Sequence, residues 1–153
     1  MDSLTVFGAK YLIFIVAAVA VIFTLLSPKR IRNDIIKLAI FSFPVAFLVA
    51  FIASHFYYDT RPFVVENAPP LIPHAPDNGF PSDHTLYAMV TAAIIFAQNR
   101  TVGISLAILA IFVGVSRIAA SVHHPIDIVG SLAIAVVVTY AGWLMLKRMS
   151  KAQ

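Results

Sequence analysis

The feature that most constrains this chain is a series of five apolar segments within only 153 residues. Hydrophobic residues make up 60% of the sequence and charged residues 12%, which is not the composition of a soluble globular domain. A membrane-spanning helix needs about 20 apolar residues, so a chain of this length can supply about five spans with their loops. We therefore predict an all-α integral membrane protein, a bundle of about five transmembrane helices in a single domain over residues 1–153.

Helix boundaries can be placed at the polar and proline-containing stretches between these segments. Pro44 lies inside the second segment, where it predicts a kink or a local break. The third segment is the shortest, although Ser82 or Asp83 at its start and Asn99 at its end are typical capping residues. The N-terminal residues lack the pattern of a cleaved leader, so we expect the first segment to remain as a span. The predicted spans are residues 10–26, 35–56, 82–98, 102–121 and 125–146.

One long loop, residues 57–81, separates the second and third segments. Its six prolines predict an irregular, stiff connection rather than a further helix, and loops of this length are more often functional than idle. Basic residues gather instead in residues 27–34, 99–101 and 147–153, which share one side of the membrane if successive helices alternate. The positive-inside rule then predicts an external N-terminus, a cytoplasmic C-terminus and an extracytoplasmic long loop.

Net charge and cysteine content limit which ligands and partners this chain can bind. The net charge of +4 is explained by the orientation of the spans, so we predict membrane lipid and no nucleic acid as a partner. The chain has no cysteine, which removes disulfides and thiolate metal ligands.

Three polar strings interrupt this apolar chain. Inserting one charged side chain at the centre of a bilayer costs about 2.5–3.5 kcal/mol, so charged residues in membrane segments usually have a function. Helix alternation places all three strings on the side of the long loop, whichever way the protein is oriented, and we expect them to converge. They are Arg61-Pro62-Phe63, then Pro81-Ser82-Asp83-His84, and then Ser116-Arg117 followed by His123 and Asp127.

His123 and Asp127 form the first candidate pair. Pro125 suits the first position of a helix, which puts Asp127 in the first turn and within reach of His123. A carboxylate bonded to one imidazole nitrogen fixes the tautomer and leaves the other nitrogen as a nucleophile or base. The alternative is that Asp127 only complements the helix dipole and His123 is an interfacial histidine.

The remaining candidates favour an anionic ligand. Arg61 and Arg117 carry forked donors that match phosphate oxygens. Ser82 opens a helix whose free N–H groups can bind an anion, although an ordinary cap explains the same residue. With His84 as an acid and His123 as a nucleophile, this set of residues indicates phosphoryl transfer.

A metal site is the rival use of the histidines. Zinc could be bound by His84, His123 and His124, since it takes three or four nitrogen or oxygen ligands. Two nearby arginines would repel the cation, so we predict no metal and no cofactor. His55 and His74 have no evident partner and are predicted to be surface or loop residues.

At this point the strings resemble the signature of the type 2 phosphatidic acid phosphatases (PAP2). That signature is a lysine, six residues and Arg-Pro; then Pro-Ser-Gly-His; then Ser-Arg, five residues, His, three residues and Asp. The third string is complete here, the second has Asp83 in place of glycine, and the first has Ser54 in place of lysine. The resemblance covers residues 54–138.

Within the family, the strings around Arg61, His74 and His84 are most similar to the undecaprenyl-diphosphate phosphatases of the bacitracin-resistance type. This resemblance implies a metal-independent hydrolase of the bacterial inner membrane, with its active site on the extracytoplasmic face. It also implies that His123 attacks the terminal phosphorus and becomes phosphohistidine, while Asp127 orients it. By the same resemblance His84 protonates the leaving group and then activates water, and the phosphate oxygens are held by Arg61, Ser82 and Arg117.

Two departures from the signature are candidate modulators. Ser54 removes a cation, and Asp83 adds a negative charge that could pair with an arginine. The catalytic strings leave the lipid open, because phosphatidylglycerol phosphate, diacylglycerol pyrophosphate or a lipid A phosphate presents the same phosphoryl group. A non-catalytic binder or transporter of lipid phosphates remains a further alternative. Oligomeric state cannot be predicted.

Overall fold

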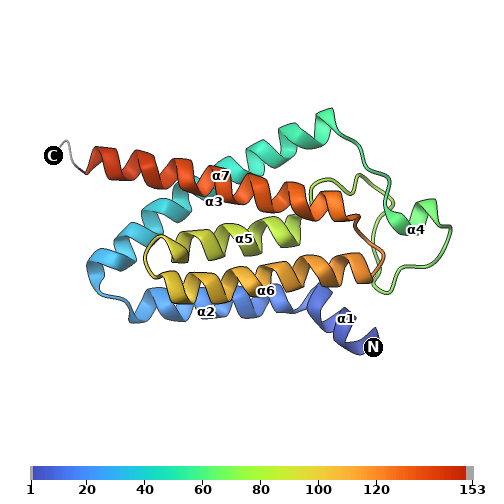
Figure 1. Ribbon diagram of the computed structural model, residues 1–153, viewed down its shortest axis with the longest axis horizontal. Coiled ribbons are helices and arrows are strands. Elements are labelled where there is room, and N and C mark those ends of the chain that lie inside the picture. Colours follow the sequence, from blue (N-terminus) through green and yellow to red (C-terminus); the bar gives the residue numbers. More distant parts are fainter. Residues whose placement is uncertain (1, 151–153) are drawn as a thin grey trace.

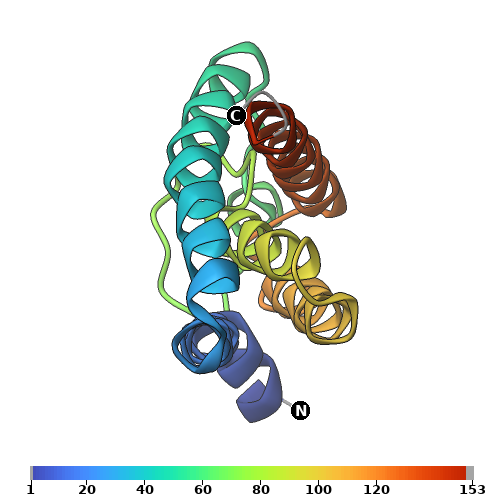
Figure 2. The same cartoon turned by 90° about the vertical axis from the view of Figure 1, so that its left-hand side faces the viewer.

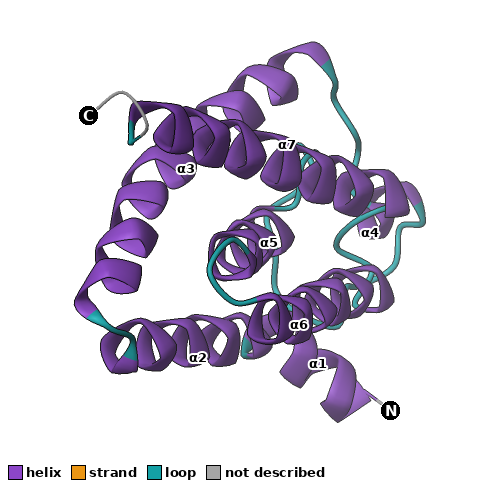
Figure 3. Ribbon diagram, turned by 60° about the vertical axis from the view of Figure 1, so that its left-hand side comes forward, coloured by secondary structure: helices purple, strands orange, loops and turns teal. Residues whose placement is uncertain are grey.

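The computed structural model describes residues 2–150, and these form helices joined by loops (Figure 1). The prediction of an all-α protein is confirmed for this part of the chain, in which a lone bridge between Thr60 and Asn78 is the only β pairing (Figure 3). Helices satisfy their own backbone groups, which a hydrocarbon environment requires. In order they are α1 (Asp2–Lys10), α2 (Leu12–Leu26), α3 (Lys29–Phe56), α4 (Pro62–Val65), α5 (Asp83–Phe96), α6 (Arg100–Ala119) and α7 (Pro125–Met149).

Length and apolar character support a multi-pass membrane protein. Three helices, α3, α6 and α7, are long and apolar enough to cross a bilayer. Helices α1 and α2 meet at an angle of 46° and together could form a fourth span. Helix α5 has 14 residues and rises about 21 Å, less than the hydrocarbon core of about 30 Å. The structure therefore supports three or four spans. The predicted fifth span corresponds to α5, which is too short to cross the hydrocarbon core by itself.

The shortness of α5 is explained by its place at the centre of the bundle. It packs against α2, α3, α6 and α7, and Figure 2 shows it enclosed by these four helices. Consecutive residues such as Ala88, Met89 and Val90 are all buried, so protein covers most of the surface of α5 between its exposed ends. A helix in this position does not have to match the thickness of the lipid.

The outer helices present large apolar side chains to their surroundings. Phe14 on α2, Ile40 on α3, Phe112 on α6 and Val137 on α7 are all more than half exposed. Apolar exposure on several faces is unusual for a soluble monomer and is what a surface in contact with lipid acyl chains requires.

The structure differs from the sequence-based expectation in α3 and in the long loop. Helix α3 begins at Lys29 rather than at residue 35, because a helix can continue through charged residues that hydropathy excludes. It also runs through Pro44 without a break. The long loop contains one short helix, α4, which begins at Pro62, where the missing N–H of proline costs no hydrogen bond.

The helices alternate so that two ends of the bundle have different character. At one end lie α1, the end of α3, the long loop, the start of α5 and the α6–α7 connection; the C-terminal end of α7 lies at the other (Figure 1). This arrangement brings the three polar strings to the same end.

Candidate functional site

The centre of the site is the turn between α6 and α7. Ser121 has a positive φ of 58°, which ends α6 and lets the chain reverse. Asp127 then falls in the first turn of α7, where its Oδ2 accepts a hydrogen bond from the backbone N–H of His124 at 2.9 Å. The same oxygen lies 3.1 Å from Nδ1 of His123. The turn thus holds a buried imidazole against a buried carboxylate.

The surroundings of His123 keep its ring neutral. Burial lowers the pKa of His123 below the ordinary value of 6.5, and the charges of Arg117 and Arg61 lower it further. The hydrogen bond to Asp127 acts in the opposite direction without outweighing these effects. A neutral ring that donates its Nδ1–H to Asp127 carries a lone pair on Nε2, which is the atom available for attack.

Arg61 is anchored beside that nitrogen by three other contacts. Its Nη1 donates to the carbonyl of Val122 at 2.7 Å and lies 3.4 Å from Nε2 of His123. Its Nη2 donates to the carbonyl of Asn78 at 3.2 Å, and its Nε donates to Asp77 at 2.7 Å. The side chain is 6% exposed, so its cation is fixed in place rather than free in solvent.

Arg117, in the last turn of α6, also approaches His123. Its Nη2 lies 3.4 Å from Nε2 of His123, and its Nη1 donates to the carbonyl of Ala9 at 3.4 Å. Its buried Nε makes no hydrogen bond to any residue in 2–150. Helix α1 comes this close because Gly8 has no side chain, since a Cβ there would overlap the hydroxyl of Ser116. The N-terminal helix is therefore part of the site, which the sequence did not predict.

The start of α5 supplies the second string. Ser82 is fully buried and tied to α7, because its N–H donates to the carbonyl of Asp127 at 3.4 Å and its carbonyl accepts from Ser131 at 2.9 Å. The side chain of His84 is partly buried and makes no hydrogen bond to another described residue. Asp83 is exposed and forms no ion pair with an arginine within residues 2–150.

Asn78 organises the long loop around the site. Its amide nitrogen donates to the carbonyls of Ser54 and Tyr57 at 3.0 Å, and its oxygen accepts from the N–H groups of Asp59 and Phe80 at 2.9 Å. Both the nitrogen and the oxygen of this amide are hydrogen-bonded, and their bonds connect the end of α3 to the residues just before α5. Ser54 takes part only through its backbone, since its hydroxyl bonds within its own helix to Phe51.

His74 lies in the long loop, as predicted, but beside His123, so the expectation that it has no partner is wrong. Its ring meets that of His123 edge to face, with centroids 6.1 Å apart. Burial, followed by the charge of Arg61, lowers the pKa of His74. Nothing in the irregular loop sequence signals this contact, because it depends on how the loop folds back. His55, in contrast, is exposed and bonds only within α3 to Phe51, as expected.

A second histidine–carboxylate pair flanks the first. Nδ1 of His124 lies 2.9 Å from Oδ2 of Asp59, and together with Asp127 these residues bring three possible metal-ligand atoms within 4.8 Å of one another. The set differs from the histidines considered from the sequence. Its closeness is explained by hydrogen bonds, because His124 binds Asp59 through its side chain and Asp127 through its backbone N–H.

Comparisons with known proteins agree with this geometry. Residues 40–151 match the model of the PAP2 superfamily. The chain is 31% identical over 140 residues to undecaprenyl-diphosphatase BcrC of Bacillus subtilis (strain 168), covering 92% of the chain and 72% of that relative. It is 35% identical over 133 residues to the putative undecaprenyl-diphosphatase YbjG of Escherichia coli (strain K12), covering 86% and 67%.

A solved structure shares the fold. The crystal structure of Aquifex aeolicus LpxE superimposes with a TM-score of 0.70 at 20% sequence identity, covering 92% of this chain and 81% of that one.

Proposed function

This chain belongs to the PAP2 superfamily, and we propose that it is a membrane hydrolase that converts undecaprenyl diphosphate into undecaprenyl phosphate and inorganic phosphate. The observation that carries the proposal is the environment of His123. Its Nδ1 lies 3.1 Å from the buried carboxylate of Asp127, and its Nε2 lies 3.4 Å from a nitrogen of both Arg61 and Arg117. A neutral nucleophile between two fixed cations suits attack on an anionic phosphorus.

In the first step, Nε2 of His123 forms a bond to the terminal phosphorus and the anhydride P–O bond breaks. The bridging oxygen leaves with the lipid phosphate, and His84 supplies its proton. The ring of His123 becomes positively charged as the bond forms, which the carboxylate of Asp127 stabilises. Arg61, Arg117 and the hydroxyl of Ser82 bind the nonbridging oxygens as the charge on them develops.

In the second step, His84 removes a proton from water, and the water oxygen attacks the phosphorus of the phosphohistidine. The P–N bond breaks, phosphate is released, and His123 returns to its neutral form. The side chain of His84 makes no hydrogen bond to another described residue, so its ring nitrogens are free to meet the leaving oxygen in the first step and water in the second. None of these steps requires a metal ion.

The proposed lipid rests on relatives that are named for undecaprenyl diphosphate. They are about one-third identical to this chain, and every residue in the proposed steps contacts only the phosphoryl end of the substrate. For this reason a second lipid phosphate, such as phosphatidylglycerol phosphate, diacylglycerol pyrophosphate or a lipid A phosphate, is the alternative substrate. Rates on a panel of these lipids at equal surface concentration decide between them.

The proposed orientation has the active site on the extracytoplasmic face of the inner membrane, with the basic connections in the cytoplasm. The end of the bundle that carries the site holds the long loop, whereas Lys29, Arg30 and Arg32 lie at the opposite end. Labelling of single cysteines placed in residues 66–68 and at residue 29 with a membrane-impermeant reagent in intact cells tests this orientation.

Replacement of the nucleophile tests the proposed activity. Purified His123→Ala should release no phosphate from undecaprenyl diphosphate above background, while His55→Ala should keep the wild-type rate. His55 is a matched control because it is an exposed histidine in the last turn of α3, bonded only within its own helix. Turnover by His123→Ala close to that of the wild type would refute the proposal.

A further inference from the structure

A cavity lies at the end of the bundle opposite the candidate site. Helices α3 and α7 cross where Gly142 faces Phe41 and Leu38; a Cβ at Gly142 would overlap the ring of Phe41 and lie 3.2 Å from Leu38 Cδ1. Beyond this crossing the start of α3 and the end of α7 diverge, as Figure 1 shows at the left of the view. The wedge between them is a cavity of about 840 Å³, closed on its inner side by the α5–α6 turn.

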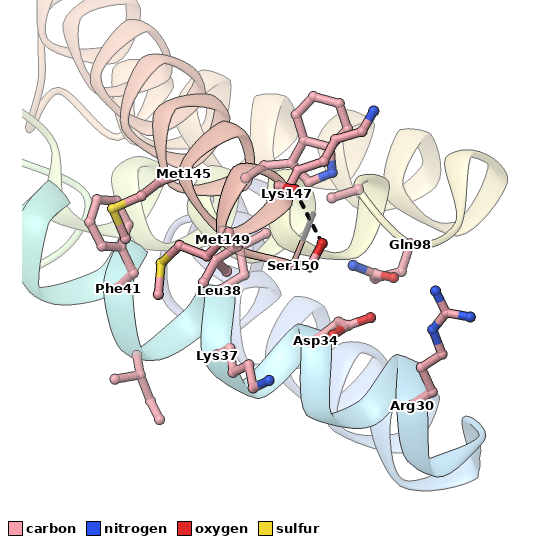
Figure 4. A pocket seen from close by; sticks show the side chains of 14 residues that line it. Arg30, Asp34, Lys37, Leu38, Phe41, Gln98, Met145, Lys147, Met149 and Ser150 are labelled. Carbon is pink, nitrogen blue, oxygen red and sulfur yellow. Dashed lines mark hydrogen bonds between the residues drawn. The ribbon is translucent and has the colours of Figure 1, made fainter. Parts of the chain in front are cut away.

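The walls of this cavity change from polar to apolar along α3. Arg30 and Gln98 lie at one side, and Phe41 and Met145 lie at the other (Figure 4). Residues 30 and 41 are eleven positions apart, which corresponds to about 16 Å along the helix. That distance is enough to reach from the headgroup region, which is several Å thick on each side of a bilayer, into the hydrocarbon core.

The polar side of the cavity is positively charged. It is lined by Arg30, Lys37 and Lys147, with Asp34 as its only acidic residue among those described. Within residues 2–150, none of these three cations forms an ion pair with a carboxylate. Lys147 instead places its Nζ 4.7 Å from the ring centre of Trp143. Three cations against one anion leave an excess of positive charge beside an apolar wall.

We propose that this cavity binds an anionic phospholipid from the leaflet opposite the candidate active site. The lipid phosphate would lie between Arg30 and Lys147, and one acyl chain would lie along Phe41 and Met145. A soluble anion would leave the apolar wall uncovered, and a neutral lipid would leave the cations without a partner. Basic pockets between membrane helices are suited to anionic headgroups because the charges act near the low-dielectric interface.

This site is separate from the proposed catalysis. The α6–α7 connection, which contains His123, and the cavity between the start of α3 and the end of α7 lie at opposite ends of the bundle (Figure 1). The lipid bound in the cavity is therefore not the lipid that is hydrolysed. The orienting effect of positive residues explains why the cations are on this side of the membrane, but it does not require them to line a cavity. That difference makes the proposal testable with neighbouring cations that do not line it.

The test titrates phosphatidylglycerol into the purified full chain in a neutral detergent and counts bound lipid by native mass spectrometry. Phosphatidylglycerol has a phosphodiester and no terminal phosphate, so the proposed hydrolysis does not consume it. The double variant Arg30→Gln/Lys147→Gln should bind it about thirtyfold more weakly, at ~1 kcal/mol for each charge removed. The matched control Lys29→Gln/Arg148→Gln removes two cations from the same end and should change the affinity less than about threefold.

The proposal would be overturned if both double variants bound phosphatidylglycerol equally weakly. It would also be overturned if the wild type bound phosphatidylcholine equally well, or if millimolar inorganic phosphate displaced the lipid. If the cavity variant does not fold, the wild type gives the answer alone. A phosphatidylglycerol with a photoreactive acyl chain should label residues near Phe41, Met145 and Met149. Labels spread evenly over the outer faces of α2, α6 and α7 would contradict the proposed site.

Discussion

Replacing Asp127 by Asn should separate activity from stability. The carboxylate contributes to the proposed reaction through its charge, since the ring of His123 becomes cationic 3.1 Å away. At an effective dielectric constant of about 20, two unit charges at that distance attract by about 5 kcal/mol. A ring that is about half charged in the transition state gains about half of this, and a fully charged ring gains all of it, so the loss in kcat should lie between about 10²-fold and 10⁴-fold.

Stability should change little in the same variant. Asparagine has the shape of aspartate and can still accept the hydrogen bond from the N–H of His124. The other carboxylate oxygen, Oδ1, is buried without a partner within residues 2–150, so removal of the charge also relieves a desolvation cost. We expect a Tm within about 4 °C of the wild type, corresponding to ~1 kcal/mol or less.

The assay is phosphate release from undecaprenyl diphosphate at saturating substrate, together with thermal unfolding in the same detergent. Glu66→Gln is the matched control, because Glu66 is an exposed carboxylate in the long loop on the same side of the bundle. A kcat for Asp127→Asn within about threefold of the wild type, with a folded protein, would refute the electrostatic role of Asp127. A Tm lowered by much more than about 4 °C, together with the loss in kcat, would show that the carboxylate stabilises the fold instead.

Three further predictions follow from the site and the packing. Because attack requires neutral His123 and burial lowers its pKa, kcat/KM should fall with decreasing pH at an inflection below 6.5, and an inflection above 6.5 would contradict this. His74→Ala should lower kcat/KM by less than about a hundredfold, since it removes a ring beside His123 but no proposed bond to substrate, whereas a loss equal to that of His123→Ala would make His74 essential. Gly103→Ala should cost about 1–3 kcal/mol and lower the Tm, because a Cβ there would meet the backbone of Phe96, which cannot move aside; an unchanged Tm would show that α5 and α6 can separate.

The helices could be predicted from the sequence because hydropathy and capping residues are local signals. Asn99, predicted to cap the end of the third segment, instead caps the start of α6, where its side chain accepts a hydrogen bond from the N–H of Val102. Ser82 precedes α5 as predicted but forms no side-chain capping hydrogen bond. Hydropathy could not give the true start of α3, where charged residues continue the helix, or the central position of α5, which depends on the packing of four other helices. A short buried helix and a short membrane span have the same composition.

The convergence of the polar strings followed from helix alternation, and the contacts among Arg61, Arg117 and His123 agree with it. Spacing along a helix also gave the His123–Asp127 pair, because three intervening residues across a helix start bring both groups to one side. The contacts of His74, Asp77 and Asn78 could not be predicted. They belong to an irregular loop, in which no periodicity relates position in the sequence to position in space.

The central claim is that His123 carries the phosphoryl group, and trapping that group tests it most directly. His84→Gln protein mixed with undecaprenyl diphosphate labelled with 32P in the terminal phosphate should accumulate labelled protein. Loss of His84 slows both steps, but it slows the attack of water more, because a lipid phosphate can leave without a proton whereas water is a poor nucleophile without a base. Peptide mapping should place an acid-labile, alkali-stable label on His123, approaching one phosphate per chain. Release of phosphate without labelled protein in a rapid-quench experiment, or a label on any other residue, would contradict the account.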